Sequence, residues 1–204
     1  MGIPQPDFVG AIAHAVARLQ AELPPVLTYH SLWHTQQDVM PAVVRLARLS
    51  HVAEEKIRLL EVAAAYHDIG LIYQHEEHEV IGAQIAAQTL PQFGFSPSHI
   101  DRIVGLILAT RLPQSPQSPL EEFLADADLD VLGREDFSSR SHALWQEMLT
   151  RGQPFTWREW CQVQLRFLKQ HAYFTPAAQA LRDAGKQQHI AALEQELQGE
   201  ADIA

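Results

Sequence analysis

Apolar residues recur every three to four positions along almost the whole chain. In residues 7–22, the apolar side chains that share one helical face are Phe8, Ile12, Val16 and Leu19. This spacing is typical of amphipathic helices. No segment shows the strict apolar–polar alternation that is typical of strands. The pattern therefore predicts an all-α fold.

Prolines and capping residues divide this pattern into separate helices. Asp7 is suited to cap the first helix, and Leu23-Pro24-Pro25 ends it. Ser31 is placed to cap the second helix, in which Pro41 predicts a kink or a break. Ser96-Pro97 opens a later helix, because proline is favoured at the first helical position. The predicted helices span residues 7–22, 31–49, 53–69, 76–90, 96–110, 120–131, 135–150, 156–171 and 176–198.

The clearest loop is the proline-rich segment 112–119. Pro113, Pro116 and Pro119 exclude a regular helix here. Two roles are open for this loop. It is either a gating element beside a functional site or a surface connector between helices.

The length and composition fit one soluble domain. A chain of 204 residues with 47% hydrophobic residues is long enough for a full core, so we expect a single domain across residues 1–204. Cys161 is the one cysteine, which excludes an internal disulfide and fits a buried thiol in a reducing compartment. We see neither a secretory signal nor an apolar run that could span a membrane, and therefore expect a cytoplasmic protein.

The net charge of −10 restricts the partners of the chain. Nucleic acid is disfavoured because its phosphates would be repelled and no cluster of Lys and Arg stands out. An acidic chain also repels small phosphorylated substrates. A site for such a substrate therefore needs a local metal ion or cationic side chains.

One set of side chains stands out as candidate metal ligands: His34, the adjacent pair His67-Asp68, and Asp128. Two imidazoles and two carboxylates suit a divalent cation and leave coordination positions open. An open position is typical of a catalytic metal site.

In their order and spacing, these residues resemble the H…HD…D pattern of the HD superfamily of metal-dependent phosphohydrolases. The supporting blocks are Tyr29-His30-x-x-x-His34, the small residues before His67-Asp68, His78-Glu79-x-x-Gly82-Ala83, and Asp126-Ala127-Asp128-Leu129-x-x-Leu132-Gly133. They cover residues 29–133, roughly half of the chain. The resemblance implies an HD-type helical bundle, with a motif-bearing core at about 26–135 and helices at about 136–200 packed on it. It also implies a divalent metal bound by His34, His67, Asp68 and Asp128.

Helical geometry sets conditions on this ligand set. His67 and Asp68 point about 100° apart on a helix, so they share an ion only if it lies between the two directions. Asp68 ends an apolar stretch, where an ionised carboxylate is costly to bury without a cation. Asp126 and Asp130 share a face that Asp128 does not. The resemblance selects Asp128, which leaves Asp126 as a substitute ligand or an orienting group and Asp130 as solvated.

The resemblance also suggests roles around the metal. His30 matches the residue that donates a proton to the leaving oxygen in the cyclic-nucleotide phosphodiesterase branch; the alternative is a surface or capping histidine. His78 matches a position that serves a second metal or a phosphate. Arg111 is a candidate phosphate ligand, although a plain surface arginine explains it equally well. His75 has no counterpart and is interpreted as a surface residue.

The predicted function is hydrolysis of a phosphomonoester or phosphodiester of a small nucleotide-like substrate by a metal-activated water, which Asp68 also orients. No histidine lies between His99 and Asp128, which favours one metal per chain over two. Mn, Mg, Co, Ni, Fe and Zn all remain candidates. One alternative is a non-catalytic module that binds metal and nucleotide. Another is a di-iron oxygenase of the same fold, which the missing histidine disfavours.

The C-terminal third is rich in aromatic residues at helical spacing, which favours core packing over stacking on a nucleobase. Its last stretch, which includes Leu181, Ile190, Leu193 and Leu197, is amphipathic. This stretch either packs on the domain or forms a homodimer contact.

Overall fold

A computed structural model describes residues 5–199, and within this range the secondary structure is helical without a strand, as predicted. The α-helices are α1 (Phe8–Glu22), α2 (Met40–Leu49), α3 (Glu54–Tyr66), α4 (His78–Thr89), α5 (Pro97–Leu108), α6 (Pro119–Asp128), α7 (Phe137–Thr150), α8 (Trp157–Gln170) and α9 (Pro176–Gly199). Four short helical segments join them: η1 (His34–Val39), η2 (Ile69–Ile72), η3 (Leu90–Phe93) and η4 (Asp130–Gly133).

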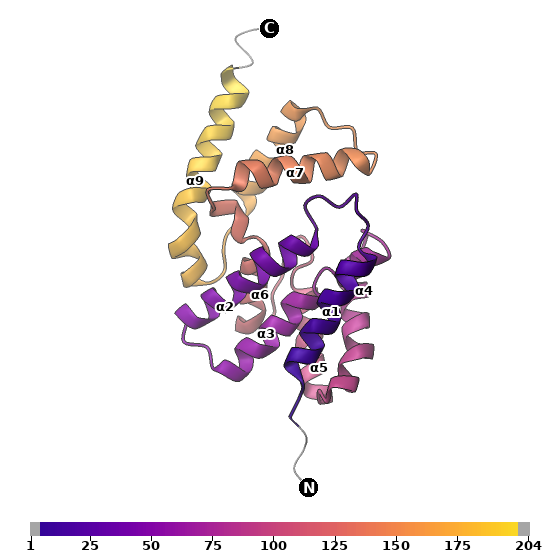
Figure 1. Cartoon of the computed structure of the whole chain (residues 1–204). Helices are drawn as coiled ribbons and strands as arrows, with labels where there is room; N and C mark the ends of the chain where they lie inside the picture. Colours follow the sequence, from indigo (N-terminus) through magenta and orange to yellow (C-terminus); the bar gives the residue numbers. More distant parts are fainter. Residues whose placement is uncertain (1–4, 200–204) are drawn as a thin grey trace.

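The helices form two layers, with α1–α6 in one and α7 and α8 lying across its end (Figure 1). Helix α3 lies at the centre of the first layer, where it packs against α1, α2, α5 and α6. Its residues from Val62 to Tyr66 are fully buried. The central helix therefore carries the chain through the core directly to His67-Asp68.

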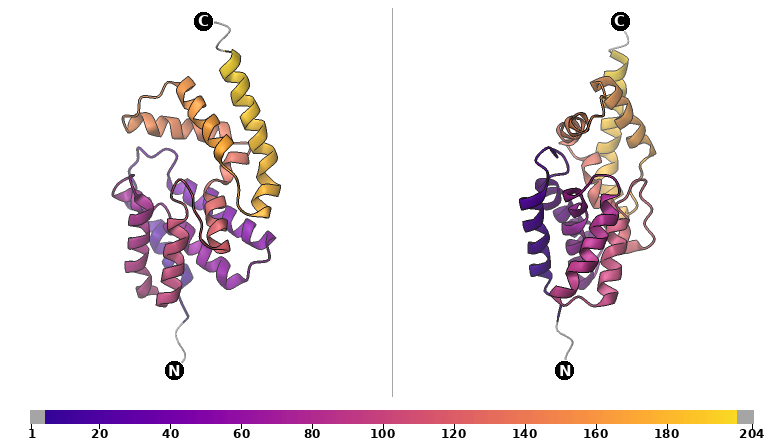
Figure 2. Two further views of the ribbon diagram at one scale, coloured as in Figure 1. Left: turned by 180° about the vertical axis from the view of Figure 1, so that it is seen from behind. Right: turned by 90° about the vertical axis from the view of Figure 1, so that its right-hand side faces the viewer.

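Helix α9 runs along one edge of both layers, and two further views show it beside α8 (Figure 2). It approaches η4 closely at a pair of glycines. A Cβ atom at Gly185 would collide with the backbone of Gly133, so this crossing requires glycine. Within residues 5–199, no helix is both long and apolar enough to cross a membrane.

Of the three predicted helix-capping residues, the structure confirms Asp7 and Ser96 but not Ser31. Asp7 accepts a hydrogen bond from the Gly10 amide, and Ser96 accepts one from the His99 amide. Ser31 does not cap the second helix; its hydroxyl donates instead to the Tyr29 carbonyl.

The predicted kink at Pro41 takes the form of a π-helical segment, η1, which comes directly before α2. Proline has no N–H to donate, so the ladder of hydrogen bonds in the preceding turns is free to widen. The segment begins at His34 itself.

Asp130 is not solvated, and that prediction is wrong. Its side chain is buried and pairs with Arg45 at 2.9 Å and with Arg182 at 2.8 Å. Two guanidinium groups offset the cost of burying this carboxylate. Asp130 therefore ties α2 and α9 to η4.

Candidate metal centre and adjoining pocket

The structure brings the four predicted ligands together. The distance from His34 Nε2 to Asp128 Oδ1 is 3.2 Å, and the distance from His67 Nε2 to Asp68 Oδ2 is also 3.2 Å. His67 Nε2 lies 3.4 Å from Asp128 Oδ1. His34 comes from η1, His67 and Asp68 follow α3, and Asp128 ends α6. Three different segments thus converge on one point.

The local backbone explains how two adjacent residues face one centre. Helix α3 ends at Tyr66, and Asp68 has φ −98° and ψ 2°, outside the regular helical values. The chain then turns into η2. Because the helix breaks here, the side chains of His67 and Asp68 do not keep the divergence that a regular helix would impose.

The hydrogen bond of His67 directs its Nε2 at the cluster. Its Nδ1 lies 2.7 Å from the Ala64 carbonyl oxygen, which only accepts, so Nδ1–H is the donor. Among the described residues, neither His67 Nε2 nor Asp68 Oδ2 finds a hydrogen-bond partner, and both atoms are buried. Buried polar atoms without partners are costly. A divalent cation would satisfy both, so these residues fit a metal ion.

The charges in the cluster support this fit. Burial on its own would lower the pKa of His67, but the charges of Asp68 and Asp128 outweigh it and raise that pKa well above its usual value. Burial likewise disfavours ionised Asp68, yet the neighbouring histidines hold its pKa well below the usual range. The two carboxylates therefore stay charged and supply negative charge for a cation.

His34 has an outer support that the sequence analysis missed. Its Nδ1 lies 3.4 Å from Asp38 Oδ2, and Asp38 is buried. Arg134 and Arg140 both form ion pairs with Asp38. Carboxylates that hold the second nitrogen of a metal-binding histidine orient its ring. Asp38 is therefore placed to orient His34.

A pocket of about 410 Å³ opens on the cluster. Its polar lining includes Asp68 and Asp128 together with His30, His75 and His78. Its apolar lining includes Val131, Leu132, Phe137, Leu144, Met148, Val163 and Phe167. The pocket thus combines polar groups of the candidate metal centre with an apolar lining contributed largely by α7 and α8.

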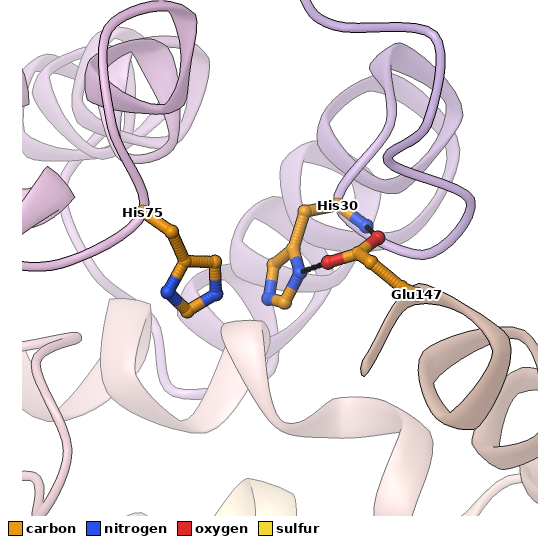
Figure 3. A group of neighbouring side chains, drawn as sticks. All are labelled: His30, His75 and Glu147. Atoms are coloured by element: carbon orange, nitrogen blue, oxygen red, sulfur yellow. Dashed lines mark hydrogen bonds and ion pairs between the residues drawn. The ribbon is translucent and has the colours of Figure 1, made fainter. Parts of the chain in front are cut away.

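His30 lies on the pocket wall between His75 and Glu147 (Figure 3). Its Nδ1 is 2.5 Å from Glu147 Oε1, while Glu147 Oε2 accepts hydrogen bonds from the amides of Tyr29 (2.8 Å) and His30 (3.1 Å). Burial raises the pKa of Glu147, but the hydrogen bond and charge of His30 and the two amides outweigh it and lower that pKa. Glu147 therefore stays ionised and keeps the proton of His30 on Nδ1.

The remaining predicted residues lie around the same pocket. His78 Nδ1 is 2.8 Å from the His75 carbonyl oxygen, and its Nε2 is 3.3 Å from Asp68 Oδ1. Arg111 lies at the rim, half exposed, with its guanidinium 3.0 Å from Glu77 Oε1. His75, which the sequence analysis interpreted as a surface residue, is half-buried and lines the pocket.

Asp126 has a structural role rather than the expected role at the metal. Its Oδ1 accepts from the Phe174 amide, and its Oδ2 accepts from the amide and hydroxyl of Thr175. Both oxygens are thus engaged with the loop before α9. Asp126 therefore neither substitutes for Asp128 nor orients a ligand.

Comparison with known proteins agrees with the fold and the cluster. Residues 37–130 match the HD domain family, a span that includes His67, Asp68 and Asp128 and begins just after His34. The match to an HD domain covers just under half of the chain. None of the curated proteins compared with it matches its sequence significantly.

Two solved structures share the fold. One is the crystal structure of Bacillus subtilis YpgQ in complex with ADP, with a TM-score of 0.64 and 19% identity over 93% of this chain and 96% of that chain. The other is a predicted HD superfamily hydrolase from an uncultured Thermotogales bacterium, with a TM-score of 0.61 and 18% identity over 98% and 94% of the two chains. At such identities the likeness is one of fold.

Proposed function

We propose that this protein is a metal-dependent phosphohydrolase that cleaves a phosphomonoester or phosphodiester of a small nucleotide-like substrate. The observation that carries the proposal is the convergence of two imidazoles and two ionised carboxylates around buried atoms that lack partners among the described residues. The match of residues 37–130 to the HD domain family supports it. The ADP bound to the similarly folded YpgQ is consistent with a phosphorylated ligand.

One divalent ion per chain would be held by His34, His67, Asp68 and Asp128. A bound divalent ion supplies a nucleophilic water at neutral pH and offsets charge that develops on a phosphoryl group. Histidine and carboxylate ligands accept several divalent ions, so the donor set leaves the identity of the metal open.

His30 is the proposed general acid, and Glu147 is its positioning residue. Ionised Glu147 accepts the Nδ1 proton of His30 at 2.5 Å, which leaves Nε2 as the nitrogen that a substrate reaches. A protonated Nε2 would donate its proton to the leaving oxygen. Asp68 has a second oxygen, Oδ1, that lies toward His78 and is suited to orient the attacking water.

The phosphate needs cationic help, because the pocket is lined by five acidic residues and two arginines: Asp68, Glu76, Glu77, Glu79, Asp128, Arg111 and Arg140. Arg140 is already paired with Asp38. Arg111 at the rim is the candidate ligand, since a guanidinium donates two parallel hydrogen bonds to phosphate oxygens once it leaves Glu77. His78 is the second candidate.

The apolar lining of the pocket suits the rest of the substrate. Its volume of about 410 Å³ falls in the range of small-molecule sites, which combine apolar walls with few polar groups. Phe167 is one of the aromatic residues that line the pocket. A nucleobase would contact this apolar lining while its phosphate lies at the His and Asp cluster.

The test combines metal analysis with a hydrolysis assay. Protein purified without chelator is expected to contain about one divalent ion per chain, the stoichiometry of a single catalytic site with open positions. It should release phosphate from nucleotides such as ADP when supplied with Mn, Mg, Co or Ni. His67→Ala should lose the ion and the activity together, whereas His99→Ala, at a histidine packed against Phe95, should keep both.

Retention of metal and turnover by His67→Ala would contradict the proposal. Metal and ADP binding without phosphate release would indicate a regulatory binding module instead. Two irons per chain would indicate the oxygenase chemistry of the same fold.

A further inference from the structure

A second group of possible metal ligands lies beside the same pocket, with His30 and His75 on its wall and Glu147 behind His30. One ligand atom each from His30, His75 and Glu147 lies within 4.8 Å of the others. Figure 3 shows the two imidazoles side by side, with Glu147 on the far side of His30. The group is separate from His34, His67, Asp68 and Asp128, and Glu147 comes from α7, outside the segment that matches the HD family.

His75 supplies the clearest sign of a missing partner. Its Nε2 is buried and has no hydrogen-bond partner in the part of the chain that the structure covers. Burial, together with the nearby charges of Arg151, His30 and His78, lowers its pKa to about 4. His75 is therefore neutral near pH 7 and offers a lone pair to an ion.

Glu147 supplies the charge for such a site. It is fully buried and ionised, and it already holds His30 through Nδ1 at 2.5 Å. Two imidazoles and one glutamate are a donor set that proteins use to bind zinc with a coordination position left open. Small rotations of the rings would bring their nitrogens onto one ion.

We propose that His30, His75 and Glu147 form a second, weaker site for a divalent transition-metal ion such as Zn²⁺, and that filling this site inhibits the enzyme. Coordination through His30 Nδ1 and Glu147 releases to solvent the proton that the two residues share. His30 then keeps a proton on Nε2 but can no longer become a doubly protonated imidazolium, so it is a poor proton donor to a leaving oxygen. The inhibition rests on the proposed function; the binding of the ion does not.

The order of the two affinities follows from the donor sets. The first centre offers four ligands with two charged carboxylates, whereas the second offers three ligands with one. An ion at the second site must also replace the hydrogen bond between His30 and Glu147. Zn²⁺ should therefore fill the second site only after the first.

The binding test uses the full chain, stripped of metal and titrated calorimetrically with Zn²⁺. Wild type should bind two ions in a tight and a weaker step. His75→Ala should lose the weaker step and keep the tight one, which also reports that the variant is folded. His99→Ala is the matched control and should keep both steps, because its ring packs against Phe95.

The complementary variant is His67→Ala, which should lose the tight step and keep the weaker one. Titration with Co²⁺ gives an independent reading, because its visible absorption reports the ligand geometry of each occupied site. Binding of a single ion by wild type at saturating Zn²⁺ would overturn the proposal. Unchanged binding of two ions by His75→Ala would also overturn it.

Inhibition is tested as a ratio within each variant. The ratio compares the rate of phosphate release at excess Zn²⁺ with the rate at one equivalent of Zn²⁺ per chain. This ratio should be well below one for wild type and near one for His75→Ala. Equal inhibition of both variants would refute the regulatory half. If wild type hydrolyses no nucleotide at all, the proposed function fails, whereas the calorimetric titration still decides the second site.

Discussion

A single carbonyl oxygen decides which nitrogen of His67 is available to a metal. The Ala64 carbonyl holds the Nδ1 proton at 2.7 Å, so Nε2 is the nitrogen that faces the two carboxylates and that would exchange its proton for a metal ion. A ring turned the other way would present Nδ1 to the candidate metal centre instead. The ligand role of His67 therefore depends on the last turn of α3 as much as on the histidine itself.

The support of His34 leads to a prediction about Asp38. Asp38→Asn removes the negative charge that holds the His34 Nδ1 proton and binds Arg134 and Arg140. We expect metal affinity to fall by about 10–100-fold, as is usual for carboxylates behind metal-bound histidines. Competition with a chelator of known affinity measures the change.

Asp101→Asn, at an exposed acid on α5, is the control and should leave the affinity unchanged. If Asp38→Asn binds metal as tightly as wild type, Asp38 does not orient His34.

The sequence predicted the residues that meet in the candidate metal centre but not their partners, for a physical reason. The ligands belong to short local patterns, whereas Glu147 contacts His30 across 117 residues and Arg134 contacts Asp38 across 96. No local periodicity encodes such pairs. Asp38 lies four residues after His34, so its spacing was a usable signal. Glu147 lies near Leu144 and Met148 on α7, both of which line the pocket. An acidic residue among apolar ones was a weaker signal of a functional role.

At the scale of the elements, close packing of backbones positions the metal centre. A Cβ atom at Gly82 would lie 3.0 Å from the Tyr66 carbonyl oxygen and 3.1 Å from that of His67. Helix α4 therefore lies directly against the end of α3. This contact explains why His78, at the start of α4, reaches Asp68.

A second element-scale contact predicts a purely structural effect at Asp126. Asp126→Ala removes the acceptor for two amides and the Thr175 hydroxyl and leaves buried donors at the start of α9 unpaired. The free energy of unfolding should fall by about 3 kcal/mol, since hydrogen bonds to a charged, buried acceptor are involved. Urea unfolding measures this loss.

The metal content of Asp126→Ala distinguishes a structural role of Asp126 from a role at the metal centre. A destabilised protein that still binds one ion per chain confirms the structural role. Loss of the ion with unchanged stability would restore Asp126 to the metal centre.

Most helix boundaries followed from periodicity and proline positions, because these act within a few residues. The form of the break near Pro41 did not. A proline predicts a disturbed helix, but whether the chain kinks, ends or widens into a π turn depends on what the turn packs against. Here it packs beside α6 and α3, with His34 facing the metal centre.

At the scale of the molecule, the pocket lies where the two layers meet. The first layer contributes the predicted metal ligands, whereas α7 contributes part of the apolar lining and holds Glu147 against His30. The HD family match ends at residue 130, before α7. The sequence could therefore indicate the metal centre, but not the shape or polarity of the wall that faces it.

The stability of the molecule should depend on pH through His171. Burial, with a smaller effect of the Lys186 charge, lowers its pKa to about 4, below the usual value of 6.5. Between these two values the unfolded chain binds a proton that the folded chain does not. The free energy of unfolding should therefore fall as the pH drops from about 6.5 to about 4.

His171→Gln should make this fall smaller by about 1–2 kcal/mol, a figure reduced because the side chain is partly exposed. Urea unfolding of both proteins near neutral pH and at mildly acidic pH gives the comparison. His51→Asn, at an exposed histidine, should behave like wild type. An identical acid sensitivity in His171→Gln would assign the effect to other groups.

The π segment η1, which comes directly before α2, changes the direction in which side chains on its two sides point. In an uninterrupted α-helix, His34 and Val43 would lie about half a turn apart, because each residue adds about 100°. A π turn takes up more residues, so η1 rotates the chain less before α2 begins. His34 can then face the same interior as Val43 and Leu46, which are fully buried. The π segment from His34 to Val39 thus corrects the rotation along the chain, so that side chains before and after it point to the same side. One continuous helical stretch can therefore contribute to both the core and the candidate metal centre.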